Sequence, residues 1–320
     1  MNLIKHIQTP LLVASIMILI VTCLLTFAQK SATEETLQIS VIVREETEDF
    51  GQSPLRHGIE DAASSINAEL TFRSLKDIRS EQEYIELLSK EIANAPDYLL
   101  LEPFDTDGLA NYLDKISKKT KIVFVNASIS SRNADAVVAD NRHAGKMLGD
   151  EVVFDSRGKA PVLIIKTDFN YSDTRYFYNG VIEALKDNGI AFDVRQIRSD
   201  DQQKQFFQLL QNTTYSSVVF LDTTQAEYFA HLKKVDDRLE HINLYGFGIN
   251  NNLLPLIDEG VMRGVSVTDQ YHIGYQSVFT AYGRPMSEDE ENLYPVKEIV
   301  VTKYNLFDSN HESLLFPKQN

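Results

Sequence analysis

Apolar and polar positions along this chain follow two different periods, and the two periods take turns. Short apolar runs such as "QISVIVRE" (38–45) and "PDYLLLEP" (96–103) are typical of strands, and the second is typical of a strand buried on both faces of a parallel sheet. Between such runs, apolar residues recur three and four positions apart, as at Ile85, Leu88 and Ile92, which predicts a helix. The pattern therefore predicts strands and helices in alternation.

This alternation runs through the chain twice. The first run of predicted strands comprises 38–45, 70–75, 96–103, 121–127 and 136–140, and the second comprises 161–167, 192–198, 216–222, 242–248, 264–269 and 297–305. Strands that are separated by helices form parallel sheets with helices on both faces. The predicted fold class is therefore α/β, with two doubly wound parallel-sheet lobes.

The N-terminal region has a different pattern, an uninterrupted apolar stretch. "LLVASIMILIVTCLLTF" (11–27) holds 17 residues without a charge, and Lys5 precedes it. This length reaches the lower limit for a membrane-spanning helix, and the positive residue before it favours an extracytoplasmic position for everything after it. We expect an uncleaved single-pass anchor in the cell membrane; a cleaved signal segment and a lipoprotein modified at Cys23 are the alternatives.

Composition narrows the classes of function. A chain of 320 residues with 43% hydrophobic content can bury two cores of ordinary size. The net charge of −15 and the lack of a Lys/Arg cluster argue against nucleic acid as a partner. Cys23 is the single cysteine, so an intrachain disulfide is excluded.

Motifs for chemistry are weak. "GFG" at 246–248 lacks the third glycine of a dinucleotide fingerprint, and the seven histidines show no zinc spacing. No nucleophile elbow of the G-x-S-x-G kind occurs. We therefore expect no catalytic residue, no metal and no cofactor, and hence no enzyme.

One junction between the two runs is chemically conspicuous. "VVADNRHAGKMLGDEV" (137–152) places Asp140, Asn141 and His143 where a predicted strand passes into a predicted helix. From the residues alone, this group could be a catalytic or metal cluster, or it could have a mechanical role.

A family resemblance bears on this choice. The segments "ISVIVREETEDFGQSPLRHGIEDAA", "PDYLLLEPFDTDGL", "KIVFVN", "VVADNRHAGKMLGDEV", "DTRYFYNGVIEALKDNGI" and "LYGFG" occur in that order. Together they resemble the type 1 periplasmic sugar-binding proteins, of the ribose- and galactose-binding class, whose fold also forms the effector domains of lactose-repressor-type regulators. The resemblance covers about 39–305, and the membrane segment excludes a repressor.

The resemblance implies a hinge of three crossing strands between the lobes. Its residues are expected to be Asp140, Asn141, Asp269 and Gln270, with Asn141 also capping the next helix. The implied parts are 1–38 as membrane segment and tether, 39–139 with 270–294 as N-terminal lobe, and 140–269 with 295–310 as C-terminal lobe. A hinge absorbs backbone rotation when lobes close on a ligand, so the mechanical role is favoured over catalysis.

The resemblance also implies ligand contacts in the cleft between the lobes. They are Asp49, Phe50, Asn126, Arg175, Asp222, Thr223 and Thr268. Two positions depart from the family, because Ala127 stands where an arginine is usual and Gly248 where an aspartate is usual. We therefore expect weak binding of ribose, galactose and xylose. The first loop is acidic (Glu45, Glu46, Glu48, Asp49); a solvated loop is the simplest interpretation, and an amine-bearing ligand is the alternative.

The predicted function is an extracytoplasmic solute-binding protein that closes on a small carbohydrate-like ligand. An uncleaved anchor favours a sensory subunit for a membrane histidine kinase; the alternative is a tethered receptor of an ABC-type sugar importer, whose partner is a permease. A glycan-processing enzyme is a third class, and it would need a pair of catalytic carboxylates facing the cleft.

Overall fold

The computed structural model describes residues 17, 21–22, 36–44, 53–115, 120–131, 134–156, 160–167, 170–198, 200–283 and 296–315. Within these residues, none of the helices has the length and apolar character needed to cross a bilayer. Most of the apolar stretch 11–27 lies outside the described residues.

The strands form two separate sheets. The first sheet has the order β2-β1-β3-β4-β5, and the pairs β1/β3, β3/β4 and β4/β5 are parallel. Its strands are β1 (Leu37–Val43), β2 (Ala68–Ser74), β3 (Tyr98–Leu101), β4 (Lys121–Val125) and β5 (Ala134–Val137).

The second sheet has the order β11-β10-β9-β8-β6-β7. Its strands are β6 (Val162–Lys166), β7 (Phe192–Gln196), β8 (Ser217–Phe220), β9 (Asn243–Phe247), β10 (Met262–Thr268) and β11 (Glu298–Val301). All its pairs are parallel except β10/β11, which is antiparallel. The exception follows from chain direction: β10 runs toward the first sheet's helices and β11 returns from them, so the two strands point in opposite directions.

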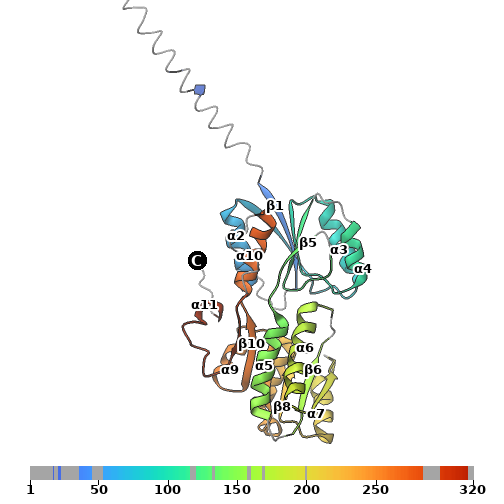
Figure 1. Cartoon of the computed structure of the whole chain (residues 1–320), viewed down its shortest axis with the longest axis vertical. Helices are drawn as coiled ribbons and strands as arrows, with labels where there is room; N and C mark the ends of the chain where they lie inside the picture. The colour runs from blue at the N-terminus through green and yellow to red at the C-terminus, as the bar shows by residue number, and fades with distance from the viewer. Residues whose placement is uncertain are drawn as a thin grey trace, which may run out of the picture. The chain divides into compact units, whose positions relative to one another are not determined.

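Helices cover both faces of each sheet (Figure 1). The helices are α2 (Pro54–Ser65), α3 (Glu81–Ala93), α4 (Asp107–Lys115), α5 (Asn141–Ser156), α6 (Ser172–Asp187), α7 (Gln202–Asn212), α8 (Thr223–Val235), α9 (Leu253–Asp258), α10 (Gln270–Tyr282) and α11 (Glu312–Leu315), with a 3₁₀ turn η2 (Asp237–Leu239). We call the first sheet with α2, α3, α4 and α10 the first lobe, and the second sheet with α5 to α9 the second lobe.

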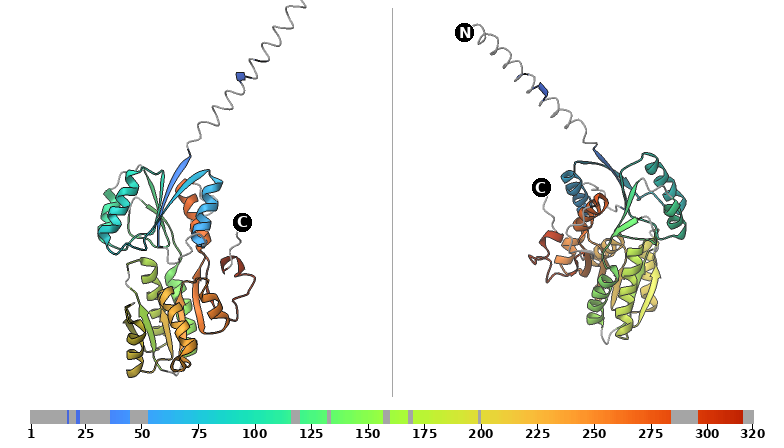
Figure 2. Two further views of the ribbon diagram at one scale, coloured as in Figure 1. Left: turned by 180° about the vertical axis from the view of Figure 1, so that it is seen from behind. Right: turned by 45° about the horizontal axis from the view of Figure 1, so that its top comes forward.

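The layering follows from the two faces of the strands. In the first lobe, Val41 and Val123 face α2 and α10, whereas Ile42 and Phe124 face α3 and α4. In the second lobe, one face of the sheet packs on α5 and α6 and the other on α7, α8 and α9, as the view from behind in Figure 2 also shows. Strands that are buried on both faces must be apolar throughout, which is the pattern that the sequence carries. The prediction of two α/β lobes with parallel sheets is confirmed.

One helix pair in each lobe is in unusually close contact. The pairs are α2 with α10 and α5 with α6. Glycines make the approach possible: a Cβ atom at Gly58 or Gly180 would lie 2.0 Å from a backbone carbonyl oxygen of the facing helix. Gly274 and Gly145 occupy the reciprocal positions on α10 and α5, at 2.1 and 2.0 Å. Each lobe is thus closed on one face by two helices whose backbones touch.

Candidate functional site

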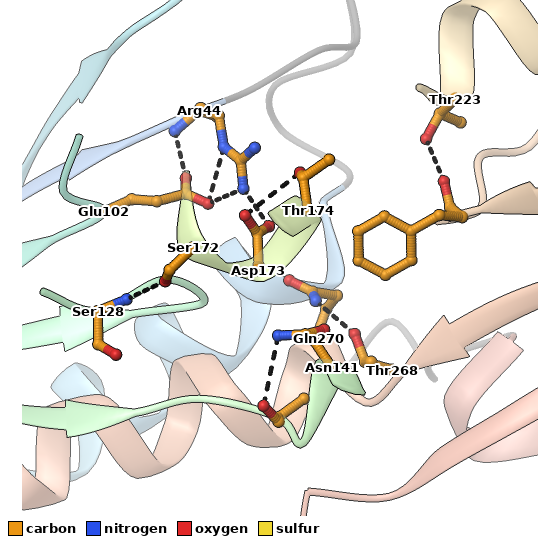
Figure 3. Close-up of polar contacts among 12 residues, drawn as sticks. Arg44, Glu102, Ser128, Asn141, Ser172, Asp173, Thr174, Thr223, Thr268 and Gln270 are labelled. Atoms are coloured by element: carbon orange, nitrogen blue, oxygen red, sulfur yellow. Dashed lines mark hydrogen bonds and ion pairs between the residues drawn. The ribbon is translucent and has the colours of Figure 1, made fainter. Parts of the chain in front are cut away.

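Arg44, the residue that follows β1, lies between two carboxylates that come from different lobes (Figure 3). Glu102 follows β3; its Oε1 accepts from Nη2 of Arg44 at 2.5 Å and from Nε at 2.9 Å, and its Oε2 accepts from the Arg44 backbone N–H at 2.6 Å. Asp173, in the first turn of α6, accepts from the same Nη2. The Glu102 side chain is 1% exposed and that of Arg44 is 24% exposed. One guanidinium therefore holds a buried carboxylate from each lobe.

Burial and charge oppose each other in this group. Burial by itself lowers the pKa of Arg44, but the carboxylates of Glu102 and Asp173 outweigh it and raise the pKa well above its ordinary value. Burial raises the pKa of Glu102, and the attraction of Arg44 offsets only a part of that rise. These groups interact in a low-dielectric interior, where the attraction between opposite charges is strong.

Aromatic rings surround the ion network. The Arg44 guanidinium lies 3.9 Å from the ring centroid of Tyr171, which belongs to the second lobe. The Tyr171 ring in turn contacts Phe104 of the first lobe edge-on, with centroids 5.1 Å apart. The hydroxyl of Tyr84 donates to the Glu102 carbonyl at 2.8 Å. The charged contact between the lobes is thus extended by an aromatic one.

Arg175, the arginine expected to bind ligand, also bridges the lobes. Its Nη1 forms an ion pair with Asp105, which follows β3 in the first lobe. The Arg175 side chain is 41% exposed, so its far side reaches solvent. A backbone bond from Asp105 N–H to the carbonyl of Asn170, 2.7 Å long, runs beside this pair. The structure places Arg175 at the interface between the lobes, where a first-lobe carboxylate already neutralises it.

Asn126 lines a cavity of about 290 Å³ on the hinge side of the same interface, together with Ser128, 138–142, Ser172 and Tyr176. Its backbone has φ of 61°, a left-handed conformation that non-glycine residues rarely adopt. Its Oδ1 is buried and has no hydrogen-bond partner among the described residues. A buried polar atom without a partner is costly, and strained residues concentrate at binding sites. A buried acceptor without a partner and a left-handed backbone thus coincide at Asn126, in the lining of this cavity.

Three residues expected to bind ligand follow or end strands of the second lobe and already have hydrogen-bond partners. Asp222 caps α8, with its Oδ1 accepting from the Gln225 N–H at 2.7 Å, and burial raises its pKa. The Thr223 hydroxyl donates to the carbonyl of Phe247 at 3.1 Å, and the Thr268 hydroxyl accepts from the Gln270 amide at 2.8 Å. The pocket that contains Asn126 includes none of the three.

The hinge positions show a shared device. Asp140 precedes α5 and accepts from the His143 N–H at 2.9 Å, and Asp269 precedes α10 and accepts from the His272 N–H at 2.9 Å. These two passages between the lobes are therefore each fixed by an aspartate that caps the next helix. The expectation that Asn141 caps α5 is wrong, because Asn141 is the first helical residue and its amide donates back to Ala139 at 3.3 Å.

Glu298 lies where the chain crosses between the lobes for the third time, and it contacts the first two crossings. It begins β11, pairs with Thr268 on β10, and its carboxylate accepts a hydrogen bond from the Asp140 backbone. Burial raises the pKa of Glu298 to about 7, and the nearby Asp140 carboxylate adds to the rise while His143 opposes it. The hinge therefore contains a carboxyl group that titrates near neutral pH.

Asp49 and Phe50, the two remaining expected contacts, lie outside the described residues, as do the acidic residues of the first loop. The sequence analysis did not single out Arg44, Glu102 or Asp173. A usable signal was present, because Arg44 and Glu102 are charged residues that directly follow buried strands, and the carboxyl ends of parallel strands meet at one edge of a sheet.

Comparison with known proteins gives a family for this arrangement. The sequence profile of the periplasmic binding protein domain family matches residues 39–283, and the chain belongs to that family. The comparison with curated proteins gives no match.

Solved structures with the same fold are similar over most of the chain. An ABC transporter solute-binding protein from Agrobacterium vitis with bound D-fucose has a TM-score of 0.76 at 18% identity, covering 87% of this chain and 100% of its own. A carbohydrate transporter solute-binding protein from Agrobacterium radiobacter in complex with D-arabinose has a TM-score of 0.75 at 17% identity, covering 88% and 100%. A glucose-galactose binding protein from Geobacillus stearothermophilus has a TM-score of 0.72 at 18% identity, covering 85% and 99%.

Proposed function

We propose that this member of the periplasmic binding protein domain family is the substrate receptor of an ABC-type sugar importer and closes on a small sugar-like ligand. One observation carries the proposal: polar side chains from both lobes meet at the carboxyl ends of the first-lobe strands, where open α/β sheets bind ligands. Amides, hydroxyls, guanidinium and carboxylate groups in such a cleft suit a ligand that carries several hydroxyl groups.

The transport role is favoured over the sensory one. The similar solved structures from Agrobacterium carry names of transporter solute-binding proteins. The histidine-kinase role favoured by the sequence rested on an uncleaved anchor, and most of that segment lies outside the described residues. The importer receptor, the alternative of the sequence analysis, is therefore the function that we propose.

A binding role also fits the buried carboxylates better than an enzymatic role does. A glycosidase needs two carboxyl groups that flank the scissile bond, one of them protonated as the general acid. Here Glu102 and Asp173 are both bound to the same nitrogen of Arg44. The Arg44 guanidinium therefore occupies the space between the two carboxylates, where a scissile bond would have to lie. We therefore assign the pair to structure and binding.

Within the proposal, the sequence-derived residues keep separate roles. Asn126 binds a ligand hydroxyl, and Arg175 contacts the ligand from the second lobe once Asp105 has moved away. Asp140, Asn141, Asp269 and Gln270 form the hinge.

Within the same proposal, the segment 11–27 anchors the chain, with the lobes extracytoplasmic. Membrane fractionation and the mass of the mature N-terminus test this part. A soluble form that begins near Gln29 would overturn the anchor but not the binding role.

Calorimetric titration of the full-length protein with a panel of aldopentoses, aldohexoses, deoxyhexoses and ketohexoses tests the function. We expect saturable binding of at least one of these sugars. Asn126→Ala should weaken that binding about tenfold or more, because one hydrogen bond in a buried site is lost.

Asn188→Ala is a matched control, since this amide lies at the far end of α6 and bonds to Ala184. The sugar affinity of the Asn188→Ala variant should equal that of the wild type. No saturable heat with any sugar of the panel would overturn the proposed function. Adjacent genes for a permease and an ATPase would support the importer role, and a kinase with a response regulator would support the sensor instead.

A further inference from the structure

One short stretch of the second lobe, 170–175, contains the first turn of α6 and contacts the first lobe at several points. The Asn170 carbonyl accepts from the Asp105 N–H at 2.7 Å, and the Ser172 hydroxyl accepts from the Ser128 N–H at 2.9 Å. Tyr171 stacks on Arg44, and Asp173 forms an ion pair with it. Arg175 completes the set through its ion pair with Asp105. Six adjacent residues thus carry backbone, hydroxyl, aromatic and charged contacts between the lobes.

On the first-lobe side, the partners all follow strands. Arg44 comes after β1, Glu102 and Asp105 come after β3, and Ser128 comes after β4. This edge of a parallel sheet is where a ligand is expected to lie. The first turn of α6 therefore lies with its side chains against this edge of the first sheet, where Asp173 contacts Arg44 and Ser172 contacts Ser128 (Figure 3).

Burial makes these ion pairs stronger than ordinary surface pairs. The side chain of Asp173 is 9% exposed, and the Glu102 side chain that shares Arg44 with it is 1% exposed. Such charges are poorly screened by solvent and salt. Asp173 also lies in the first turn of a 16-residue helix, where a negative charge is favourable. Burial and helix position thus both strengthen the contact between Asp173 and Arg44.

We infer that the first turn of α6 is a built-in occupant of the cleft that holds the lobes closed in the absence of ligand, with the Asp173–Arg44 pair as its principal contact. A ligand enters when Asp173 leaves Arg44, and the freed guanidinium, still held by Glu102, then binds a ligand oxygen. The ligand step rests on the proposed function, whereas closure without ligand rests on the contacts alone.

Distance measurements on the ligand-free protein test this inference. Spin labels at Lys90→Cys on α3 and Lys186→Cys on α6 report the separation of the lobes, in a full-length background with Cys23→Ser. Both lysines are exposed. We expect the background protein to show mainly the short separation of the present structure. Asp173→Asn should raise the population with a longer separation about tenfold, because a charge-assisted bond is lost while Arg44 keeps Glu102.

Glu183→Gln is the matched control. It removes the same charge from the same helix, but Glu183 pairs with Arg142 and Lys146 inside the second lobe. The control should keep the distance distribution of the background protein. Asp105→Asn, which removes the partner of Arg175, should open the lobes in the same direction as Asp173→Asn.

Two results would overturn the inference: a ligand-free background protein that is mainly open, or an Asp173→Asn variant no more open than Glu183→Gln. The measurement uses no sugar, so its failure leaves the receptor function intact. Conversely, a protein that binds no sugar could still show the closed ligand-free state.

Discussion

The two lobes use the same helix-packing device but assemble it differently. In both, paired glycines let two helices touch through their backbones: Gly58 with Gly274 in the first lobe, and Gly145 with Gly180 in the second. In the second lobe the two helices, α5 and α6, follow each other around β6. In the first lobe, α2 lies near the start of the fold, whereas α10 follows β6 to β10 of the second lobe. The helix pair of the first lobe can therefore form only after the chain has returned from the second lobe. The helix pair of the second lobe forms between neighbouring elements of the chain.

The strand ends of the two lobes also differ. The first lobe presents Arg44 and Asp105, which form ion pairs with the second lobe, and Glu102, which holds Arg44. After the second-lobe strand β8, Asp222 and Thr223 form hydrogen bonds within their own lobe. The difference indicates that the first lobe supplies charged side chains at its strand ends, while the second lobe supplies the first turn of α6 that contacts them.

The largest expected effect concerns sugar affinity, because each lobe lacks one charged residue that is usual in the sugar-binding proteins the sequence resembles: an arginine at position 127 and an aspartate at position 248. Ala127 is buried in the first lobe, and Gly248 of the second has φ of 82° with Thr223 close to its missing Cβ. Hydrogen bonds to charged groups contribute about 1.5–3 kcal/mol each. Their absence should cost ribose, galactose and xylose roughly 3–6 kcal/mol, or about 10² to 10⁴ in affinity.

Calorimetric titration with these three sugars checks this prediction. Submicromolar binding of any of them would show that other cleft residues replace the two charged groups. Arg44 is then the first candidate, since it is the first-lobe cation nearest to Asp173 in the second lobe.

The glycine pairs should give the next largest effect. Gly58→Ala places a Cβ atom 2.0 Å from the Tyr271 carbonyl oxygen, and Gly180→Ala places one 2.0 Å from the Arg142 carbonyl oxygen. Since a backbone cannot yield as a flexible side chain does, each change should destabilise the protein by about 3 kcal/mol. Thermal unfolding measures this, and Ser64→Ala at an exposed position of α2 is the control.

Both glycine variants should also change the separation of the spin-labelled lobes. The reason is that α10 begins at Asp269 of the expected hinge and α5, on which Gly180 packs, begins at Asp140. Equal stability of either variant and the wild type would contradict the close packing of that helix pair.

Most of the fold could be predicted from the sequence because burial on both faces imposes a pattern that is visible locally. The apolar run at 96–103 predicts the strand at 98–101, and the spacing of Ile85, Leu88 and Ile92 predicts the helix at 81–93. The antiparallel β11 was not expected, since its direction depends on a passage through the other lobe and not on its own residues.

The site was harder to predict than the fold. Arg44 and Glu102 are 58 positions apart, and their contact exists because β1 and β3 are neighbours in the sheet, which no local spacing reveals. Asp173 stands two residues before Arg175, the residue chosen by resemblance, yet it is the one that reaches Arg44. Resemblance to a family indicates which sequence positions lie in the cleft. Which side chains form ion pairs there depends on how the two lobes meet in this protein.

Two buried carboxyl groups at strand ends should respond differently to loss of charge. Glu102→Gln removes the partner that orients Arg44 and should cost about 2 kcal/mol of stability. Asp222→Asn should change stability by less than about 0.5 kcal/mol, because asparagine caps a helix as well as aspartate does. Urea unfolding at neutral pH compares the two variants through their midpoints. A larger loss of stability in Asp222→Asn than in Glu102→Gln would contradict the view that Glu102 acts through its charge and Asp222 as a helix cap.

The smallest expected effect lies in the hinge, where the lobes meet and where Glu298 titrates. Its pKa is raised from the ordinary 4.5 to about 7, with burial as the main cause, Asp140 adding to the rise and His143 opposing it. Between these values the folded state binds more protons than the unfolded state, so this group's contribution to stability is full below about pH 4.5 and is lost as the pH rises through about 7. The group is partly solvated, so the effect should remain below about 1 kcal/mol.

Glu298→Gln keeps an acceptor for the Asp140 N–H and removes the titration. We expect the stability of the wild type relative to this variant to fall from pH 5 to pH 8, measured by urea unfolding at several pH values; a flat or rising difference would show that Glu298 is solvated like an ordinary surface carboxylate.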